Sequence, residues 1–372
     1  MVYKVIGLMS GSSLDGLDIV YAHLQETAGK WSYEIVRSDC YPYTPEWIES
    51  LTKATSLSAL EYQLLHTAFG HFLGQQVNRF IEENNLHFQV QLIASHGHTT
   101  FHLPQKKMTS QLGEGAAIAA ETGINVINDL RAMDVALGGQ GAPIVPIGEK
   151  FLLGEYDFFL NLGGIANISA SFNSSAASGN FVAFDICPAN RILNMLANKA
   201  GKTFDENGEM AAKGSVKPDL LDRLNRFEYY SLPFPKSLAN DFGTDRIYPV
   251  IQDSGNNTVD SLRTYVDHVC IQVTNSVNQL ISGFETPKGT YKLLATGGGA
   301  HNIFLVERLK QSLTPLQVEL VVPENELIDY KEGLIIGLIG VLRWREENNV
   351  LSTVTGATRN SIGGAVWIGQ QV

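Results

Sequence analysis

The 372-residue sequence has only three cysteines, no long hydrophobic run and no excess of basic residues. Cys40, Cys187 and Cys270 are far apart and form no CxxC pair, which excludes a small disulfide scaffold and favours a reducing compartment. The longest apolar stretch, residues 333–342, is about half the roughly 20 residues that span a bilayer. The N-terminal apolar run is too short for a signal peptide. We therefore expect a cytoplasmic protein without a membrane partner.

Basic residues are outnumbered, with 27 Lys and Arg against 38 Asp and Glu, a net charge of −11. Nucleic-acid binding depends on a basic face that neutralises phosphates, so we expect no nucleic-acid partner. The length predicts two domains or one duplicated domain, because a single domain usually spans about 100–200 residues.

The 35 glycines gather in clusters that follow short apolar runs. These runs predict buried strands, each ending in a glycine turn, at residues 3–8, 125–127, 156–160 and 291–295. Apolar residues at helical spacing predict long helices over residues 58–84 and 260–284, and Pro188 suggests a further helix over residues 189–199. Because strands and helices alternate, the fold class is α/β.

Two segments, residues 3–24 and 157–172, share a strand–glycine turn–strand pattern. This indicates either a duplicated domain or a chance similarity between two buried hairpins. We expect an N-terminal domain over residues 1–127 and a C-terminal domain over residues 128–352. The tail, about residues 353–372, is expected to pack back on the first domain.

Two glycine loops are candidate phosphate sites. The first, between Ser10 and Asp18, combines small residues, hydroxyl groups and two carboxylates; the second lies between Asn161 and Asn167. Backbone N–H groups in such loops can bind phosphate while a carboxylate holds Mg²⁺. A plain polar β-turn explains the same composition.

Two nucleotide-binding motifs fail on inspection. Gly201-Lys202-Thr203 resembles the end of a Walker A loop, but Leu196 stands where the first glycine is required, so we interpret it as a helix end. The glycines of residues 297–299 are not part of a GxGxxG motif.

Three further groups of residues are candidates for chemistry. Asp185 follows an apolar strand, where partial burial suits a general base, although Asp is also a preferred helix cap. His96, His98 and His102 would share one face of a regular strand, but Gly97 breaks the strand and no Cys or Glu completes a zinc site, so a polar substrate loop is the preferred interpretation. Arg131 suits a carboxylate clamp or a surface ion pair.

Taken together, these strings resemble the anhydro-N-acetylmuramic acid kinases, a family within the superfamily of acetate and sugar kinases, Hsp70 and actin. The resemblance rests on Gly-Leu-Met-Ser-Gly-Ser-Ser-Leu-Asp-Gly-Leu-Asp at residues 7–18 and on five further matches in the family's order, at residues 95–99, 129–131 with 138–143, 161–167, 184–185 and 297–302. It implies two RNase-H-like (actin-like ATPase) domains around a central cleft.

The resemblance also implies the site and its ligands, ATP and Mg²⁺. Asp185 would be the catalytic base, and Asp15 a tentative metal ligand. Thr99, Arg131 and Glu332 would contact an amino-sugar substrate. The implied ATP-binding residues are Gly11, Ser12, Ser13, Leu14, Asp15, Gly16, Leu17, Asp18, Asn161, Gly163, Gly164, Asn167, Gly297, Gly298, Gly299 and Asn302. A homodimer is a further implication.

The implied reaction opens the 1,6-anhydro bridge of anhydro-N-acetylmuramic acid with water and phosphorylates O6, giving N-acetylmuramate 6-phosphate and ADP in peptidoglycan recycling. The family's Phe-Asp-Thr-Gly-Pro-Gly-Asn stands here as Phe-Asp-Ile-Cys-Pro-Ala-Asn at residues 184–190. Its Pro-Lys-Ser-Thr-Gly-Arg-Glu stands as Pro-Lys-Ser-Leu-Ala-Asn-Asp at residues 235–241. These departures keep two alternatives open: a kinase for another anhydro sugar such as levoglucosan, and a catalytically silent sugar or nucleotide sensor.

Overall fold

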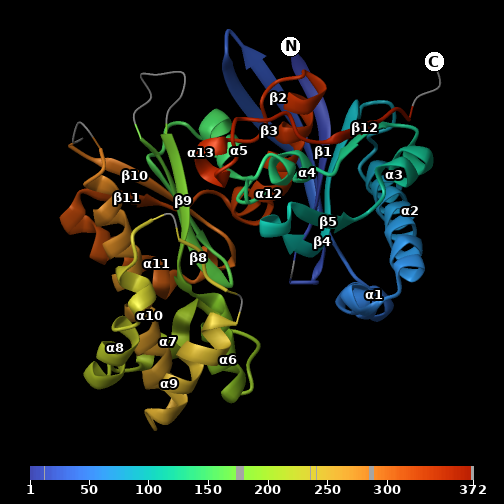
Figure 1. Cartoon of the computed structure of the whole chain (residues 1–372). Helices are drawn as coiled ribbons and strands as arrows, with labels where there is room; N and C mark the ends of the chain where they lie inside the picture. Colours follow the sequence, from blue (N-terminus) through green and yellow to red (C-terminus); the bar gives the residue numbers. More distant parts are fainter. Residues whose placement is uncertain (12, 173–179, 235, 240, 285–288, 370–372) are drawn as a thin grey trace. The chain divides into compact units, whose positions relative to one another are not determined.

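The computed structural model describes residues 1–11, 13–172, 180–234, 236–239, 241–284 and 289–369 (Figure 1). The chain divides into two compact units. Unit 1 comprises Met1–Gly154 with Tyr330–Val372, and unit 2 comprises Glu155–Asp329. The boundaries expected at 127/128 and 352/353 both fall inside unit 1. The difference arises because residues 128–154 and 330–352 pack on the first sheet.

Unit 1 is built on a seven-stranded sheet with the order β12-β6-β4-β1-β2-β3, and β5 pairs with β4. β1, β2 and β3 are antiparallel neighbours, whereas β4 is parallel to both β1 and β6. The strands are β1 (Val2–Ser10), β2 (Gly16–Thr27), β3 (Lys30–Pro42), β4 (Leu92–Leu103), β5 (Met108–Leu112), β6 (Asn125–Asn128) and β12 (Ala365–Trp367). Residues of the C-terminal tail thus complete this sheet, because β12 pairs with β6.

Helices cover both faces of β1. Ile6 and Leu8 point into a core that includes Phe69 and Leu73 of α2, while Gly7, which faces the other way, lies against Gly333 of α12. The helices of unit 1 are α1 (Pro45–Lys53), α2 (Ala59–Glu83), α3 (Gly115–Thr122), α4 (Ala132–Ala136), α5 (Pro146–Leu152), α13 (Ser352–Thr355) and most of α12 (Asn325–Trp344), with short 3-10 turns η1 (Ala54–Ser56) and η2 (Pro104–Lys106).

Unit 2 repeats the strand order of unit 1 in its sheet β9-β8-β7-β10-β11. Again the first three strands along the chain are antiparallel neighbours, and two later strands are added in parallel beside the first. The strands are β7 (Phe158–Leu162), β8 (Ile165–Phe172), β9 (Asn180–Pro188), β10 (Tyr291–Thr296) and β11 (Val318–Val321). The two-unit α/β fold is confirmed, and the matching strand order supports duplication over chance similarity.

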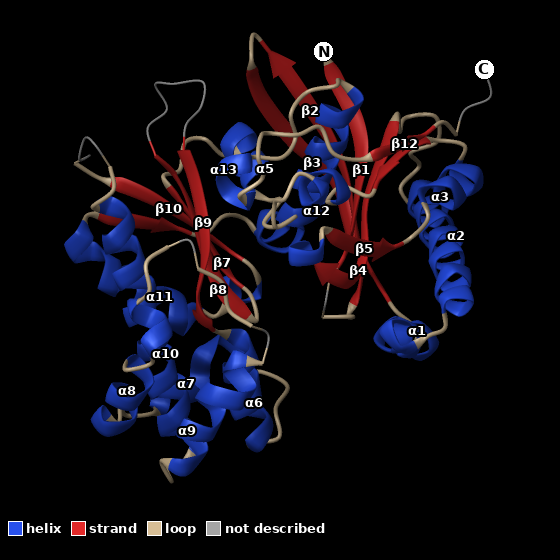
Figure 2. Cartoon of the chain, viewed as in Figure 1, coloured by secondary structure: helices blue, strands red, loops and turns tan. Residues whose placement is uncertain are grey.

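Helices α6 to α10 gather beside this second sheet (Figure 2). The most buried is α10, whose Leu262, Val266 and Val273 are fully enclosed in the core. The helices are α6 (Asn190–Lys199), α7 (Glu209–Lys213), α8 (Pro218–Asn225), α9 (Tyr248–Asp253), α10 (Thr258–Ile281) and α11 (Ile303–Leu313). Shorter segments are η3 (Glu206–Gly208), η4 (Glu228–Ser231), η5 (Phe242–Ile247), η6 (Gly298–His301) and η7 (Thr314–Leu316).

Local signals in the sequence explain where the two long helices begin. Ser58 and Glu61 form a reciprocal capping box at the start of α2, and the Asn257 side chain accepts a bond from the Asp260 N–H at the start of α10. Both predicted helices are confirmed. Pro188, by contrast, ends β9 rather than starting α6. Within the described ranges, no helix is both long enough and apolar enough to cross a membrane.

Candidate active site

The first glycine loop joins β1 to β2 in unit 1, and its charge is concentrated at Asp15. The exposed Asp15 carboxylate accepts hydrogen bonds at Oδ1 from Ser13 Oγ (2.6 Å) and from the Gly16 N–H (3.1 Å). Its Oδ2 has no hydrogen-bond partner among the described residues. The described part of the loop is therefore polar, and it carries one exposed carboxylate with an oxygen that accepts no hydrogen bond from the described residues. Ser12 lies outside the described residues.

Other members of this loop differ in what they can offer. Leu17 is buried and pairs with Ser10 in the sheet, so its side chain serves the core. Asp18 lies beside the thiol of Cys40 on β3. Burial, followed by the hydrogen bond with Asp18, raises the pKa of that thiol to about 12. Cys40 is thus a poor nucleophile at neutral pH.

The second glycine loop and the glycines of residues 297–299 lie together in unit 2. A Cβ on Gly297 would collide with Asn161 Oδ1, and one on Gly299 would lie 2.7 Å from the Leu162 Cβ. Gly164 is exposed at the tip of the β7–β8 hairpin. Gly298, which follows β10 in the sequence, is exposed as well. The structure therefore brings the two predicted ATP-binding segments of unit 2 side by side.

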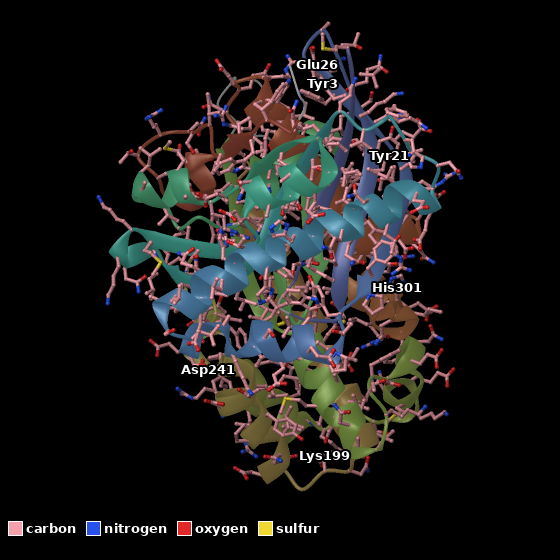
Figure 3. All side chains as sticks on the ribbon, turned by 90° about the vertical axis from the view of Figure 1, so that its right-hand side faces the viewer. Tyr3, Tyr21, Glu26, Lys199, Asp241 and His301 are labelled. Atoms are coloured by element: carbon pink, nitrogen blue, oxygen red, sulfur yellow. The ribbon has the colours of Figure 1, made fainter. Side chains whose placement is uncertain are left out.

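Asn302, the last residue of the predicted ATP-binding string at residues 297–302, has a structural role. Asn302 caps α11, since its Oδ1 accepts a hydrogen bond from the Leu305 N–H at 3.0 Å. The preceding His301, labelled in Figure 3, contacts Asp329 through Nε2 at 2.7 Å. The Asn302 side-chain oxygen is therefore already occupied, which limits it as a direct ligand.

Asp185 stands in a polar row that crosses three strands of unit 2. Asn161 on β7 pairs with Asn167 on β8, which in turn pairs with Asp185 on β9. Asp185 does not cap the next helix, because Ala189 occupies the cap position and no side chain caps α6. The helix-cap interpretation is wrong, since Asp185 lies within the strand.

The Asp185 carboxylate is held on one side only. Its Oδ2 accepts the Leu238 N–H at 2.9 Å, and its Oδ1 accepts no hydrogen bond from the described residues. The backbone of Asp185 is fixed on both sides: its N–H donates to the Lys236 carbonyl (3.1 Å) and its carbonyl accepts from the Tyr229 hydroxyl (2.7 Å). Burial raises the pKa of Asp185, and the hydrogen bond from the Leu238 N–H lowers it by a smaller amount. One oriented oxygen with raised basicity is what a general base requires.

Tyr229, Tyr230, Lys236 and Leu238 are neighbours of Asp185 that the sequence did not identify as such. Lys236 Nζ donates to the carbonyls of Tyr229 and Tyr230 (3.1 and 3.4 Å) and lies 4.8 Å above the Tyr229 ring. These residues are thereby folded into a brace for Asp185. The family string at residues 235–241 pointed to this part of the sequence. The contacts with Asp185 could not be predicted from it, because the Leu238 N–H and the Lys236 carbonyl are backbone groups that every non-proline residue has.

The three predicted sugar contacts lie in unit 1: Thr99 within β4, Arg131 after β6 and Glu332 on α12. Thr99 is exposed on β4, and its Oγ1 lies 3.4 Å from Gln111 Nε2. Arg131 follows β6, and burial lowers its pKa to about 10, opposed by the charges of Glu332 and Asp134. Unit 1 therefore brings Arg131 and Glu332 into electrostatic range of each other.

The histidines of β4 do not act as one cluster. Gly97 has φ +70°, and the register between β1 and β4 shifts there, so that Ser10 pairs with His98. His98 Nδ1 lies 3.2 Å from Ser10 Oγ, whereas His96 Nε2 contacts Arg131. Gly97 thus interrupts the regular alternation that a shared histidine face would need, as its place in the sequence suggests, although the histidines lie on strand β4 and not in a loop.

Known proteins match the chain along nearly its whole length. The sequence profile of the family described as anhydro-N-acetylmuramic acid kinase matches residues 3–369. A relative from Haemophilus influenzae, named anhydro-N-acetylmuramic acid kinase, is 33% identical over 95% of this chain and 94% of its own. A relative of the same name from Aliivibrio fischeri is 32% identical over 98% and 99%.

The glycine turns, the partly buried carboxylate and these relatives define the class: the chain is a kinase, an enzyme that transfers a phosphoryl group. Within that class, it belongs to the anhydro-N-acetylmuramic acid kinase family.

Proposed function

We propose that this enzyme converts 1,6-anhydro-N-acetylmuramic acid, ATP and water into N-acetylmuramate 6-phosphate and ADP. The observation that carries the proposal is Asp185, a partly buried carboxylate with Oδ2 bound to the Leu238 N–H and Oδ1 left for a proton. We further propose, from the resemblance, that the reaction belongs to cytoplasmic peptidoglycan recycling and that the enzyme is a homodimer.

The proposed reaction starts at Asp185. Its Oδ1 takes a proton from water, and the water oxygen forms a bond to the anomeric carbon. The bond between that carbon and O6 breaks, and its electron pair stays on O6. O6 then forms a bond to the γ-phosphorus while the bond to ADP breaks. A single base thus starts both bond changes, because the leaving oxygen becomes the nucleophile.

The groups that we assign to the phosphates and the metal are glycine turns in each unit and the Asp15 carboxylate. The exposed glycines Gly164 and Gly298 leave the backbone of unit 2 open to a phosphate, and Asp15 presents Oδ2 in unit 1. No group of three metal-ligating side chains occurs in the described part of the chain. This donor set fits Mg²⁺, which is usually held by one or two carboxylates together with phosphates and water. Bound Mg²⁺ would neutralise charge on the phosphates.

The sugar side favours a substrate that carries a carboxylate. We assign Arg131 to the lactyl carboxylate, Thr99 to a sugar hydroxyl and Glu332 to a polar group of the ring. Arg131 makes no ion pair within 4.0 Å with any described carboxylate, so its charge is available to a ligand. Levoglucosan has no carboxylate to meet it.

The test is a mass-spectrometric assay with ATP, Mg²⁺ and 1,6-anhydro-N-acetylmuramic acid in ¹⁸O-labelled water. We expect a 6-phosphorylated product with one label at the anomeric hydroxyl and none in the phosphate. Unlabelled N-acetylmuramate 6-phosphate, incubated in the same water, corrects for exchange at the anomeric carbon. Absence of product despite ATP binding would overturn the proposal and leave another anhydro sugar or a silent sensor.

A further inference from the structure

Arg131 is aimed by two acceptors, one of which is a histidine. Its Nε–H donates to His96 Nε2 at 2.9 Å, and its Nη1 donates to the Gly141 carbonyl at 2.5 Å. A guanidinium group has five N–H donors in a rigid plane, so these two bonds fix the plane and leave three donors. No carboxylate among the described residues takes them at ion-pair distance.

The protonation state of His96 follows from its partners. Arginine can only donate, so His96 Nε2 is an acceptor and carries no hydrogen. Nδ1 lies 2.8 Å from the Gly97 carbonyl, which can only accept, so the hydrogen is on Nδ1. His96 is only 3% exposed, and burial together with the Arg131 charge lowers its pKa to about 3. The ring is therefore neutral and remains an acceptor at any ordinary assay pH.

The second acceptor is itself fixed. The Gly141 N–H donates to Asp134 Oδ2 at 2.8 Å, and the Thr355 hydroxyl donates to Asp134 Oδ1 at 2.7 Å. Asp134 and Thr355 are buried at 0% and 1% exposure. Asp134 thus balances the charge of Arg131 from a distance while holding the loop, and does not use up the guanidinium donors.

We propose that His96 is a positioning residue that orients the Arg131 guanidinium toward the carboxylate of the sugar, and thereby sets the preference for a carboxylate-bearing anhydro sugar. The proposal rests on the proposed function, because it assumes that Arg131 meets the lactyl carboxylate. His96 itself does not touch the sugar in this assignment; it acts through Arg131.

The test compares two sugars on the full-length enzyme: 1,6-anhydro-N-acetylmuramic acid and 1,6-anhydro-N-acetylglucosamine, which lacks the lactyl group. His96→Phe keeps the size of the ring but removes the acceptor. We expect kcat/KM for the carboxylate sugar to fall roughly 10- to 100-fold, mainly through KM, with little change for the other sugar. His96→Gln, which can place an oxygen near the former Nε2, should recover most of the loss, and the exposed His87→Gln is the surface control.

A double-mutant cycle with Arg131→Met separates positioning from general damage. If His96 acts through Arg131, His96→Phe has less than about a twofold further effect in the Arg131→Met background. An equal loss for both sugars, or a full His96→Phe effect without Arg131, overturns the proposal.

Calorimetric titration of both sugars without ATP distinguishes a failure of the positioning role of His96 from a failure of the proposed function. If the wild type binds the carboxylate sugar more tightly than the other and His96→Phe abolishes that difference, positioning holds even if turnover is absent. If the wild type binds neither sugar or does not distinguish them, the positioning role is wrong. Wild-type turnover with an unchanged preference in His96→Phe overturns the positioning role alone.

Discussion

At the residue scale, the burial of Asp185 has opposite consequences for activity and stability. Replacement by Asn removes the proposed base, and we expect turnover to fall by about 10²- to 10⁴-fold, with nucleotide affinity nearly unchanged. Because the folded-state pKa is raised, the ionised carboxylate destabilises the fold at neutral pH. Asp185→Asn should therefore raise the melting temperature, and scanning calorimetry with a turnover assay checks both.

The stability gain also has a predictable pH dependence. A raised pKa means that the folded state favours the protonated acid, so the penalty is present above the folded pKa and disappears as pH falls through it. The melting temperatures of the wild type and of Asp185→Asn should therefore converge in acid. A lower melting temperature for the variant at pH 7 would contradict this account of the site.

The same carboxylate predicts the acid side of the activity profile. Only the ionised form of Asp185 can accept a proton from water, and burial raises its pKa above the ordinary value of an aspartate. We expect kcat/KM for the sugar to decline toward acid with an apparent pKa above that value. Nucleotide affinity measured over the same pH range is the control. If nucleotide affinity and kcat/KM decline together toward acid, the titrating group belongs to the nucleotide site and not to Asp185.

At the scale of elements, β1 and α12 approach each other through glycines. A Cβ on Gly7 would overlap the Gly333 carbonyl oxygen, and one on Gly333 would lie 2.5 Å from Val20 Cγ2. At Gly337 the nearest atom, Val5 Cγ1, is 3.2 Å away. We expect Gly7→Ala and Gly333→Ala to destabilise the protein by about 1–3 kcal/mol and Gly337→Ala by less.

Denaturant unfolding of the three variants measures this order. Gly337→Ala is the matched control, since it adds the same methyl group to the same helix with more room. Equal losses at Gly333 and Gly337 would mean that the close approach of strand and helix is not what constrains Gly333.

Elements with a local cause were predictable from the sequence. The two long helices carry apolar stripes and side-chain caps. Gly201 follows the end of α6 with φ +74°, which is the conformation expected of a glycine that ends a helix. The site was predictable only in part. Asp185 and Arg131 follow from residue type and motif, but the Leu238 N–H and the neutral His96 depend on contacts 53 and 35 residues away in sequence.

At the scale of the whole molecule, unit 2 is one continuous segment with its own core. Its strands and helices enclose residues such as Phe158, Tyr265 and Leu293, all within residues 155–329. We expect a fragment of residues 155–329 to fold independently, giving a single cooperative thermal transition by circular dichroism. Residues 1–154 alone lack α12 and β12 and are the matched comparison, expected to remain poorly folded. A non-cooperative transition for the first fragment would refute the independence of unit 2.

Because the sequence of unit 2 is inserted between the two segments of unit 1, unit 2 can complete its folding on the ribosome before unit 1 does. The first 154 residues emerge early, but β6 waits for residues 365–367 to pair with its outer edge, and β1 waits for the glycine face of α12. At about 5–20 residues per second, residues 155–367 take tens of seconds to synthesise. During that interval unit 2 can complete its fold while residues 1–154 still expose an unpaired strand edge, which makes residues 1–154 a natural client of a chaperone.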